Sequence, residues 1–156
     1  MFKKLFSGKI KSDPIEPIFP KENYSIFKLD MEDGLAFATV NTGYNDYPNK
    51  GHFPWCAQIV ISIHGKNDNG HPTDEESVVL NDLESKITEF LKMTQTVHPV
   101  GRVTRNGERD IIYYIDEPRL DQKETKEFFD EINAVRNLNL TVERDPKWEF
   151  VSAFIA

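Results

Sequence analysis

The sequence predicts an α+β fold, and two observations lead to that prediction. From Trp55 onward the expected elements run strand, helix, strand, strand, helix, strand, which is the split βαβ order of a ferredoxin-like two-layer sandwich. Apolar residues recur at every second position in the expected strands and at helical spacing in the expected helices. An additional N-terminal β-hairpin precedes this unit. The length of 156 residues and the 38% hydrophobic content suit one domain with one sizeable core.

Residues 1–22 are predicted to form a flexible tail that is basic at first and then rich in proline. The first twelve residues contain four lysines and no acid, and the prolines at positions 14, 17 and 20 interrupt any helix. One amphipathic turn through Phe2, Leu5 and Phe6 on a membrane surface is the alternative, but so short a segment holds poorly alone. Residues 23–156 are predicted to form a single α+β domain.

The N-terminal hairpin is predicted from two alternating segments, residues 23–30 and 34–42, with a turn at residues 31–33. A loop rich in Gly, Asn, Asp and Pro follows. Residues 55–64 then form the clearest strand in the chain. Its odd-numbered side chains make one apolar face, which consists of Trp55, Ala57, Ile59, Ile61 and Ile63.

Two helices are predicted from capping residues and apolar spacing. Thr73 and Glu76 form a capping box, in which both side chains satisfy amides at the start of a helix that ends near Met93. Asp121 and Glu124 open the second helix in a similar way, and it ends near residue 137. Residues 138–143 and 148–155 are predicted as the last two strands. The expected buried helical residues are Val79, Leu83, Ile87, Phe90 and Leu91 in the first helix, and Phe128, Phe129, Ile132 and Val135 in the second.

The central hairpin, residues 97–116, turns at Asn106-Gly107, and two registers are possible. A two-residue loop places Val103 opposite Asp110. A three-residue loop that begins at Arg105 places Arg102 opposite Asp110 instead, with Val100 opposite Ile112 and His98 opposite Tyr114. We predict the three-residue loop, because it gives a cross-strand ion pair on one face and an apolar opposite face. That apolar face consists of Val103, Ile111, Tyr113 and Ile115.

The other face of the hairpin is the candidate binding surface. In the predicted register it carries Val100, Arg102, Ile112 and Tyr114. Apolar residues mixed with tyrosine and arginine are enriched in recognition patches. Two alternative interpretations do not involve a partner. In the first, the N-terminal hairpin covers this face; in the second, Arg102 forms only the ion pair with Asp110.

Charge and cysteine content indicate the surroundings of the protein. The net charge is −7, and its acids all lie beyond the lysine-rich first twelve residues, so nucleic-acid binding is not expected. Residues 34–40 faintly resemble the aromatic strand of RNA-recognition modules, which leaves an RNA-binding module as a lesser alternative. The single cysteine, Cys56, cannot form an internal disulfide, and no apolar run approaches the roughly 18 residues of a membrane span. We therefore expect a cytoplasmic protein without a membrane span.

No motif in the sequence identifies a reaction. The four histidines, His52, His64, His71 and His98, lack the spacing of a zinc site. Cys56 lies within a strand and is interpreted as a semi-buried thiol rather than a nucleophile. We therefore predict no catalytic residue, no metal site and no cofactor. An enzyme whose active-site residues are dispersed along the chain remains the alternative to a binding module.

Three groups of residues resemble a known family. These are Gly70-x-Pro72 before the first helix, the central hairpin with Gly101-Arg102-Val103-Thr104, and Asp145-Pro146-x-Trp148 near the end. Their order and spacing are similar to the bacterial domain-of-unknown-function family 695, from about residue 23 to residue 155. That family has no established activity, and some members are joined to domains similar to the ribonuclease E regulator B family. The resemblance therefore implies a non-enzymatic bacterial module that binds a protein partner in a regulatory role, with oligomeric state left open.

Overall fold

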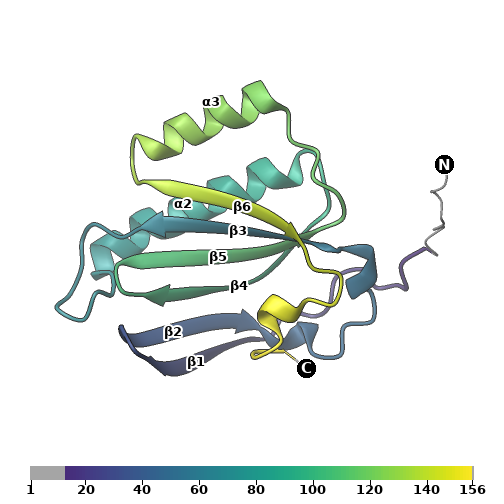
Figure 1. Cartoon of the computed structure of the whole chain (residues 1–156), viewed down its shortest axis with the longest axis horizontal. Coiled ribbons are helices and arrows are strands. Elements are labelled where there is room, and N and C mark those ends of the chain that lie inside the picture. The colour runs from purple at the N-terminus through teal and green to yellow at the C-terminus, as the bar shows by residue number, and fades with distance from the viewer. Residues whose placement is uncertain (1–12, 156) are drawn as a thin grey trace.

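The computed structural model describes residues 13–155. They form an α+β domain in which one six-stranded antiparallel sheet, in the order β1-β2-β4-β5-β3-β6, carries two α-helices (Figure 1). The α+β class and the N-terminal hairpin are as predicted. The strands are β1 Tyr24–Met31, β2 Gly34–Asn41, β3 Trp55–Ser62, β4 Val97–Arg105, β5 Glu108–Ile115 and β6 Leu138–Arg144. The helices are α2 Asp74–Lys92 and α3 Gln122–Asn133, with short 3-10 turns η1 Thr42–Tyr44, η2 Lys50–His52 and η3 Glu149–Val151.

Within residues 13–155, neither helix combines the length and the apolar character that crossing a membrane requires. Residues 13–22, the described part of the predicted tail, lie against the domain. The Ile15 N–H donates to Asn49 Oδ1 at 2.7 Å, and Asn49 Nδ2 donates to the Ile15 carbonyl at 2.6 Å. The Phe19 ring lies 4.5 Å from the His98 ring. Residues 1–12 lie outside the described residues, and the division at residue 22 stays a prediction.

One hydrophobic core lies between the sheet and the two helices. The odd-numbered side chains of β3 and β5, among them Ile59, Ile61 and Ile111, meet the apolar stripe of α2. Ile132 joins this core from α3, so both helices cover the same face of the sheet. The buried residues of α2 are Glu76, Leu80, Leu83, Ile87 and Leu91, while the predicted Val79 and Phe90 are partly buried.

A second core closes the other face of the sheet, and its centre is a group of rings that we call the aromatic cluster: Tyr44, Tyr47, Phe53, His98, Tyr114 and Trp148. Trp148 is 1% exposed, stacks on Tyr114 with ring centroids 4.1 Å apart, and donates from Nε1 to the Phe53 carbonyl at 2.9 Å. The loop between β2 and β3 and the C-terminal segment therefore cover this face. The N-terminal hairpin does not, because β2 pairs edge to edge with β4.

The predicted strand over residues 148–155 is wrong. Trp148 has a left-handed backbone, with φ 57°, and the chain then forms the turn η3. The carboxylate of Asp145 causes this change of direction, because it accepts the N–H of Glu149 at 2.9 Å and of Phe150 at 3.0 Å. Trp148 turns inward as a result, and its ring fills the second core.

The predicted three-residue loop of the central hairpin is also wrong near the turn. Arg105 pairs with Glu108 around a two-residue loop, in which Asn106 and Gly107 have φ values of 45° and 81°. A β-bulge between Pro99 and Gly101 then shifts the register, so that His98 lies opposite Tyr114 as predicted. Between the turn and the bulge the faces are exchanged. Arg102 therefore lies on the helix side of the sheet, and Val103 lies on the other side.

The predicted cap of α2 is half correct. The Thr73 hydroxyl oxygen accepts the N–H of Glu76 at 3.2 Å, as a capping residue does. The Glu76 side chain does not return to Thr73, whose N–H donates to the Gly65 carbonyl at 2.9 Å. Glu76 is 4% exposed and accepts from Arg136 Nε at 2.8 Å and from the His64 N–H at 2.8 Å. This carboxylate thus joins α2 to the end of β3 and to the segment after α3.

Candidate functional site

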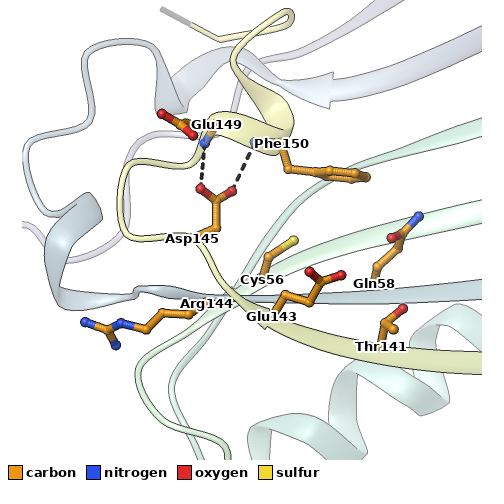
Figure 2. A pocket seen from close by; sticks show the side chains of 8 residues that line it. All are labelled: Cys56, Gln58, Thr141, Glu143, Arg144, Asp145, Glu149 and Phe150. Atoms are coloured by element: carbon orange, nitrogen blue, oxygen red, sulfur yellow. Dashed lines mark hydrogen bonds between the residues drawn. The ribbon is translucent and has the colours of Figure 1, made fainter.

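A surface groove lies between the end of β6, the neighbouring strand β3 and the C-terminal turn (Figure 2). Its volume is about 370 Å³. We call it the Phe150 groove, because the Phe150 ring forms one wall and is 52% exposed. The lining residues are Cys56, Gln58, Thr141, Glu143, Arg144, Asp145, Glu149 and Phe150.

The alternation of the two strands builds the floor of the Phe150 groove. Cys56 and Gln58 of β3 point away from the helices, and their partners in register are Glu143 and Thr141 of β6. Thr141 and Glu143 are exposed, and Gln58 Nε2 donates to Asp110 Oδ2 at 3.1 Å. Gln58, Thr141 and Glu143 therefore make the floor polar, and the Phe150 ring adds an apolar wall.

Asp145 fixes the shape of the groove. Its Oδ2 accepts the hydroxyl of Tyr114 at 2.6 Å, in addition to the Phe150 N–H, and its Oδ1 accepts the Glu149 N–H. Burial raises the pKa of this carboxyl, but the hydrogen bonds from Tyr114 and from the two amides outweigh it, so the pKa of Asp145 is lowered. Asp145 is thus an ionised anchor that ties the C-terminal turn to β5.

The groove is negatively charged. The Glu143 side chain stands on the floor beside Cys56 (Figure 2). Arg144 also lines the groove, but its guanidinium extends away from Glu143. Arg144 lies instead over the Trp55 ring, 5.6 Å from its centroid. The positive charge nearest to Glu143 in sequence is therefore on the opposite side of the sheet, which leaves Glu143 as the exposed charge of the floor.

Cys56 is not activated in this arrangement. The thiol is 7% exposed, and burial raises its pKa to about 11, although the Tyr114 hydroxyl acts in the opposite direction. A thiol with this pKa is protonated at neutral pH and is a poor nucleophile. The sequence predicts a semi-buried thiol that is not a nucleophile, and the structure buries the thiol more fully than that.

The strand β6 is an edge of the sheet. Ser62 N–H donates to the Asn137 carbonyl at 3.0 Å and Asp145 N–H donates to the Pro54 carbonyl at 2.7 Å, so the odd-numbered residues of β6 bond to β3. The N–H and C=O groups of Leu140 and Val142 consequently point outward. No strand in the described part of the chain pairs with them, and this open edge runs beside the Phe150 groove.

The four residues of the predicted binding surface do not form one exposed face. Val100, Ile112 and Tyr114 are 1%, 3% and 0% exposed, because the aromatic cluster and the C-terminal turn cover them. Arg102 lies on the helix side, where its Nη1 donates to Glu84 Oε1 at 3.0 Å. The predicted open face is therefore wrong, and the bulge in β4 is the reason for the separation of Arg102 from the other three.

The histidines are dispersed. His71 is buried, with Nε2 at 2.7 Å from the Leu35 carbonyl, and His98 lies inside the aromatic cluster. Among residues 13–155, no three His, Cys, Asp or Glu side chains gather as a metal-binding group.

Sequence reasoning missed the residues that shape the groove. The sequence predicts Glu149 and Phe150 in a strand, whereas the structure places them in the turn η3. The Asp145-Pro146 pair is the local signal that favours a turn. The aromatic cluster also went unrecognised, because its rings come from four distant parts of the chain.

Two helices cover one face of the sheet and the aromatic cluster covers the other. With the turn capped by Asp145, they define an α+β domain that has an open groove beside a strand edge. The chain belongs to the family of unknown function DUF695, whose family model matches residues 22–155. The predicted membership is confirmed. No curated protein and no solved structure matches the chain significantly.

Proposed function

We propose that the domain is a non-enzymatic protein-binding module that receives an extended segment of a partner protein along β6. One observation carries this proposal: an exposed aromatic wall and an exposed carboxylate frame a groove directly beside an open strand edge. An extended segment that pairs with an edge strand gains affinity from main-chain hydrogen bonds. The outward N–H and C=O groups of Leu140 and Val142 are the partners that such a segment would use.

The side chains of the Phe150 groove would supply the specificity. Every second side chain of an added strand would lie on the groove side, next to Thr141 and Glu143. A basic side chain there would pair with Glu143, and an apolar one would pack on Phe150, which is 52% exposed. The partner segment is therefore expected to carry a Lys or Arg near an apolar residue.

The chemistry of the groove supports binding over catalysis. The raised pKa of Cys56 and the full hydrogen bonding of the Asp145 carboxylate leave neither group ready to attack or to transfer a proton. A regulatory role in a bacterial cytoplasm is the setting that the family resemblance suggests, and we include it in the proposal. The alternative of an enzyme with dispersed residues would require a reaction centre elsewhere.

We also propose that β3 to β6 form a ferredoxin-like split βαβ unit. The element order β3-α2-β4-β5-α3-β6 and the strand order β4-β5-β3-β6 support this assignment. The β1–β2 hairpin would then be an extension of that unit at the β4 edge.

A peptide-display selection on the purified domain tests the proposed function. Random extended peptides are selected, resynthesised with a fluorophore, and titrated by fluorescence anisotropy. We expect a basic residue beside an apolar one in the selected peptides. Glu143→Lys should weaken binding at least tenfold, because the replacement repels the basic residue of the peptide.

The control variant is Glu131→Lys, which makes the same charge change at an exposed position of α3. It should bind as the wild type does. Equal affinity of the Glu143→Lys and Glu131→Lys variants, or a failure to select any peptide, would contradict the proposal.

A further inference from the structure

A second site lies on the helix side of the sheet, remote from the Phe150 groove. The helix α2 contacts β4, and the β1–β2 hairpin extends the sheet beyond β4, away from the helices (Figure 1). The result is a cleft between α2 and the hairpin, which we call the Arg102 cleft. It consists of two adjoining hollows of about 320 Å³ and 410 Å³ that share Glu84 and Arg102.

Two arginines share one carboxylate in this cleft. Arg102 Nη1 lies 3.0 Å from Glu84 Oε1, and Arg109 Nη1 lies 3.5 Å from the same oxygen. Arg109 is 5% exposed and also donates to Asn81 Oδ1 at 2.8 Å, and its buried Nε has no partner in the described part of the chain. Arg102, Arg109 and Glu84 together therefore carry one net positive charge, in a protein whose net charge is −7.

The excess charge is reachable through Arg102. Its side chain is 32% exposed, and Glu84 is the one hydrogen-bond acceptor that the described residues provide for it. A guanidinium has five N–H donors, so most of those of Arg102 remain available to a ligand in the cleft. Planar carboxylates match this donor geometry well.

The walls of the cleft restrict the ligand further. Tyr24, Pro99 and Ile111 line the hollow on the sheet side, and the Tyr24 ring is half-exposed. Ser85 and Thr88 line the hollow along α2, where the Thr88 hydroxyl donates to the Glu84 carbonyl at 2.8 Å. A ligand with an apolar or aromatic body would pack on Tyr24 while its anionic group meets Arg102.

The acids around the cleft limit the charge of the ligand. Glu89 lines the hollow along α2, and its carboxylate lies 3.9 Å from Lys92. Glu22 lies close enough to Tyr24 to raise the pKa of its hydroxyl, after the larger effect of burial. A single negative charge compensates the excess of the Arg102–Glu84–Arg109 group, whereas a dianion would also face these two acids.

We propose that the Arg102 cleft binds a small monocarboxylic acid with an apolar or aromatic body. The carboxylate accepts hydrogen bonds from Arg102, and the body packs against Tyr24 and Pro99. This site is independent of partner binding at β6, since the two lie on opposite faces of the sheet.

The test uses the whole chain and a panel of phenylacetate, benzoate and 3-phenylpropionate, with phenylacetamide as the uncharged match for phenylacetate. Binding is followed by ¹⁵N–¹H correlation spectra and by the rise of the melting temperature. We expect saturable shifts at the amides of Gly101 and Arg102 with at least one acid, and none with phenylacetamide. Arg102→Gln should weaken this binding at least tenfold. That variant keeps the Glu84–Arg109 pair, and circular dichroism checks its fold.

Arg105→Gln is the matched control, because Arg105 makes an exposed ion pair with Asp33 at 3.0 Å outside the cleft. It should bind the acids as the wild type does. Absence of saturable binding by all three acids, equal binding by the Arg102→Gln variant, or shifts caused by inorganic phosphate alone would each overturn the proposal.

Discussion

Acidification provides a direct test of the aromatic cluster through His98. This side chain is 0% exposed, and its Nδ1 lies 2.8 Å from the Tyr44 hydroxyl. Its Nε2 has no partner among residues 13–155, and rings surround it: Phe19, Tyr44, Tyr47, Phe53 and Trp148. Burial lowers the pKa of His98 to about 4, although the charge of Asp116 acts in the opposite direction.

The sign of the effect follows from which state binds the proton first. The unfolded chain protonates His98 near pH 6.5, whereas the folded protein does so only near pH 4. Stability contributed by His98 is therefore complete above about pH 6.5 and falls as the pH is lowered toward 4. At 1.36 kcal/mol per pKa unit, this single group should lower the free energy of unfolding by about 2 kcal/mol between pH 7 and pH 5.

The assay is urea denaturation, followed by circular dichroism, at several pH values in that range. The variant His98→Gln removes the titrating group and keeps a polar side chain beside Tyr44. We expect its free energy of unfolding to vary about 2 kcal/mol less than that of the wild type between pH 7 and pH 5. Parallel pH profiles for the two proteins would refute the assignment of a neutral, buried His98.

Three further predictions concern the framework of the domain. Thr73→Ala should lower the free energy of unfolding by about 0.5–2 kcal/mol in urea denaturation, because it removes the cap of α2, and an unchanged midpoint would contradict that role. Glu76→Gln should cost about 3 kcal/mol, because it leaves the Arg136 charge unpaired. The hydrogen bonds from Arg136 are the chief cause that lowers the pKa of Glu76 to about 2. The contribution of Glu76 to the free energy of unfolding should therefore persist at pH 5 and disappear as the pH falls from 4.5 to 2. A loss that is already complete at pH 5 would contradict this expectation. Cys56 in the folded protein should react with a thiol reagent at neutral pH about 100-fold more slowly than a free cysteine. In denaturant it should react at the rate of a free cysteine. A fast reaction in the folded protein would show an exposed thiolate and contradict the burial.

The regular elements were predictable because local patterns determine them. The strand predicted from alternation over residues 55–64 and the helix predicted after Thr73 are confirmed, and their ends agree with β3 and α2 within one or two residues. The register of the central hairpin was not predictable in this way, because Val100 and Val103 lie on the same face although they are three positions apart in the strand. Only an inserted residue permits that arrangement, and Gly101 beside the bulge is a weak signal for it.

The candidate site was less predictable than the fold. Arg102 was identified, but as part of a surface with Tyr114, which the structure buries under Trp148. Glu84 and Arg109 lie 25 positions apart in sequence and meet only through the packing of α2 on the sheet. The capped turn at Asp145 depends on the Tyr114 hydroxyl, 31 positions away. Contacts of this kind leave no local pattern in a single sequence.

Amide hydrogen exchange along β6 tests the proposed partner site most directly. The N–H groups of Leu140 and Val142 point outward from the sheet edge and pair with no strand of residues 13–155, so they should exchange quickly in the free domain. A selected peptide that adds to this edge should slow both amides at least tenfold, without slowing the outward amides of β1. Unchanged exchange at Leu140 and Val142 under saturating peptide would contradict binding along β6.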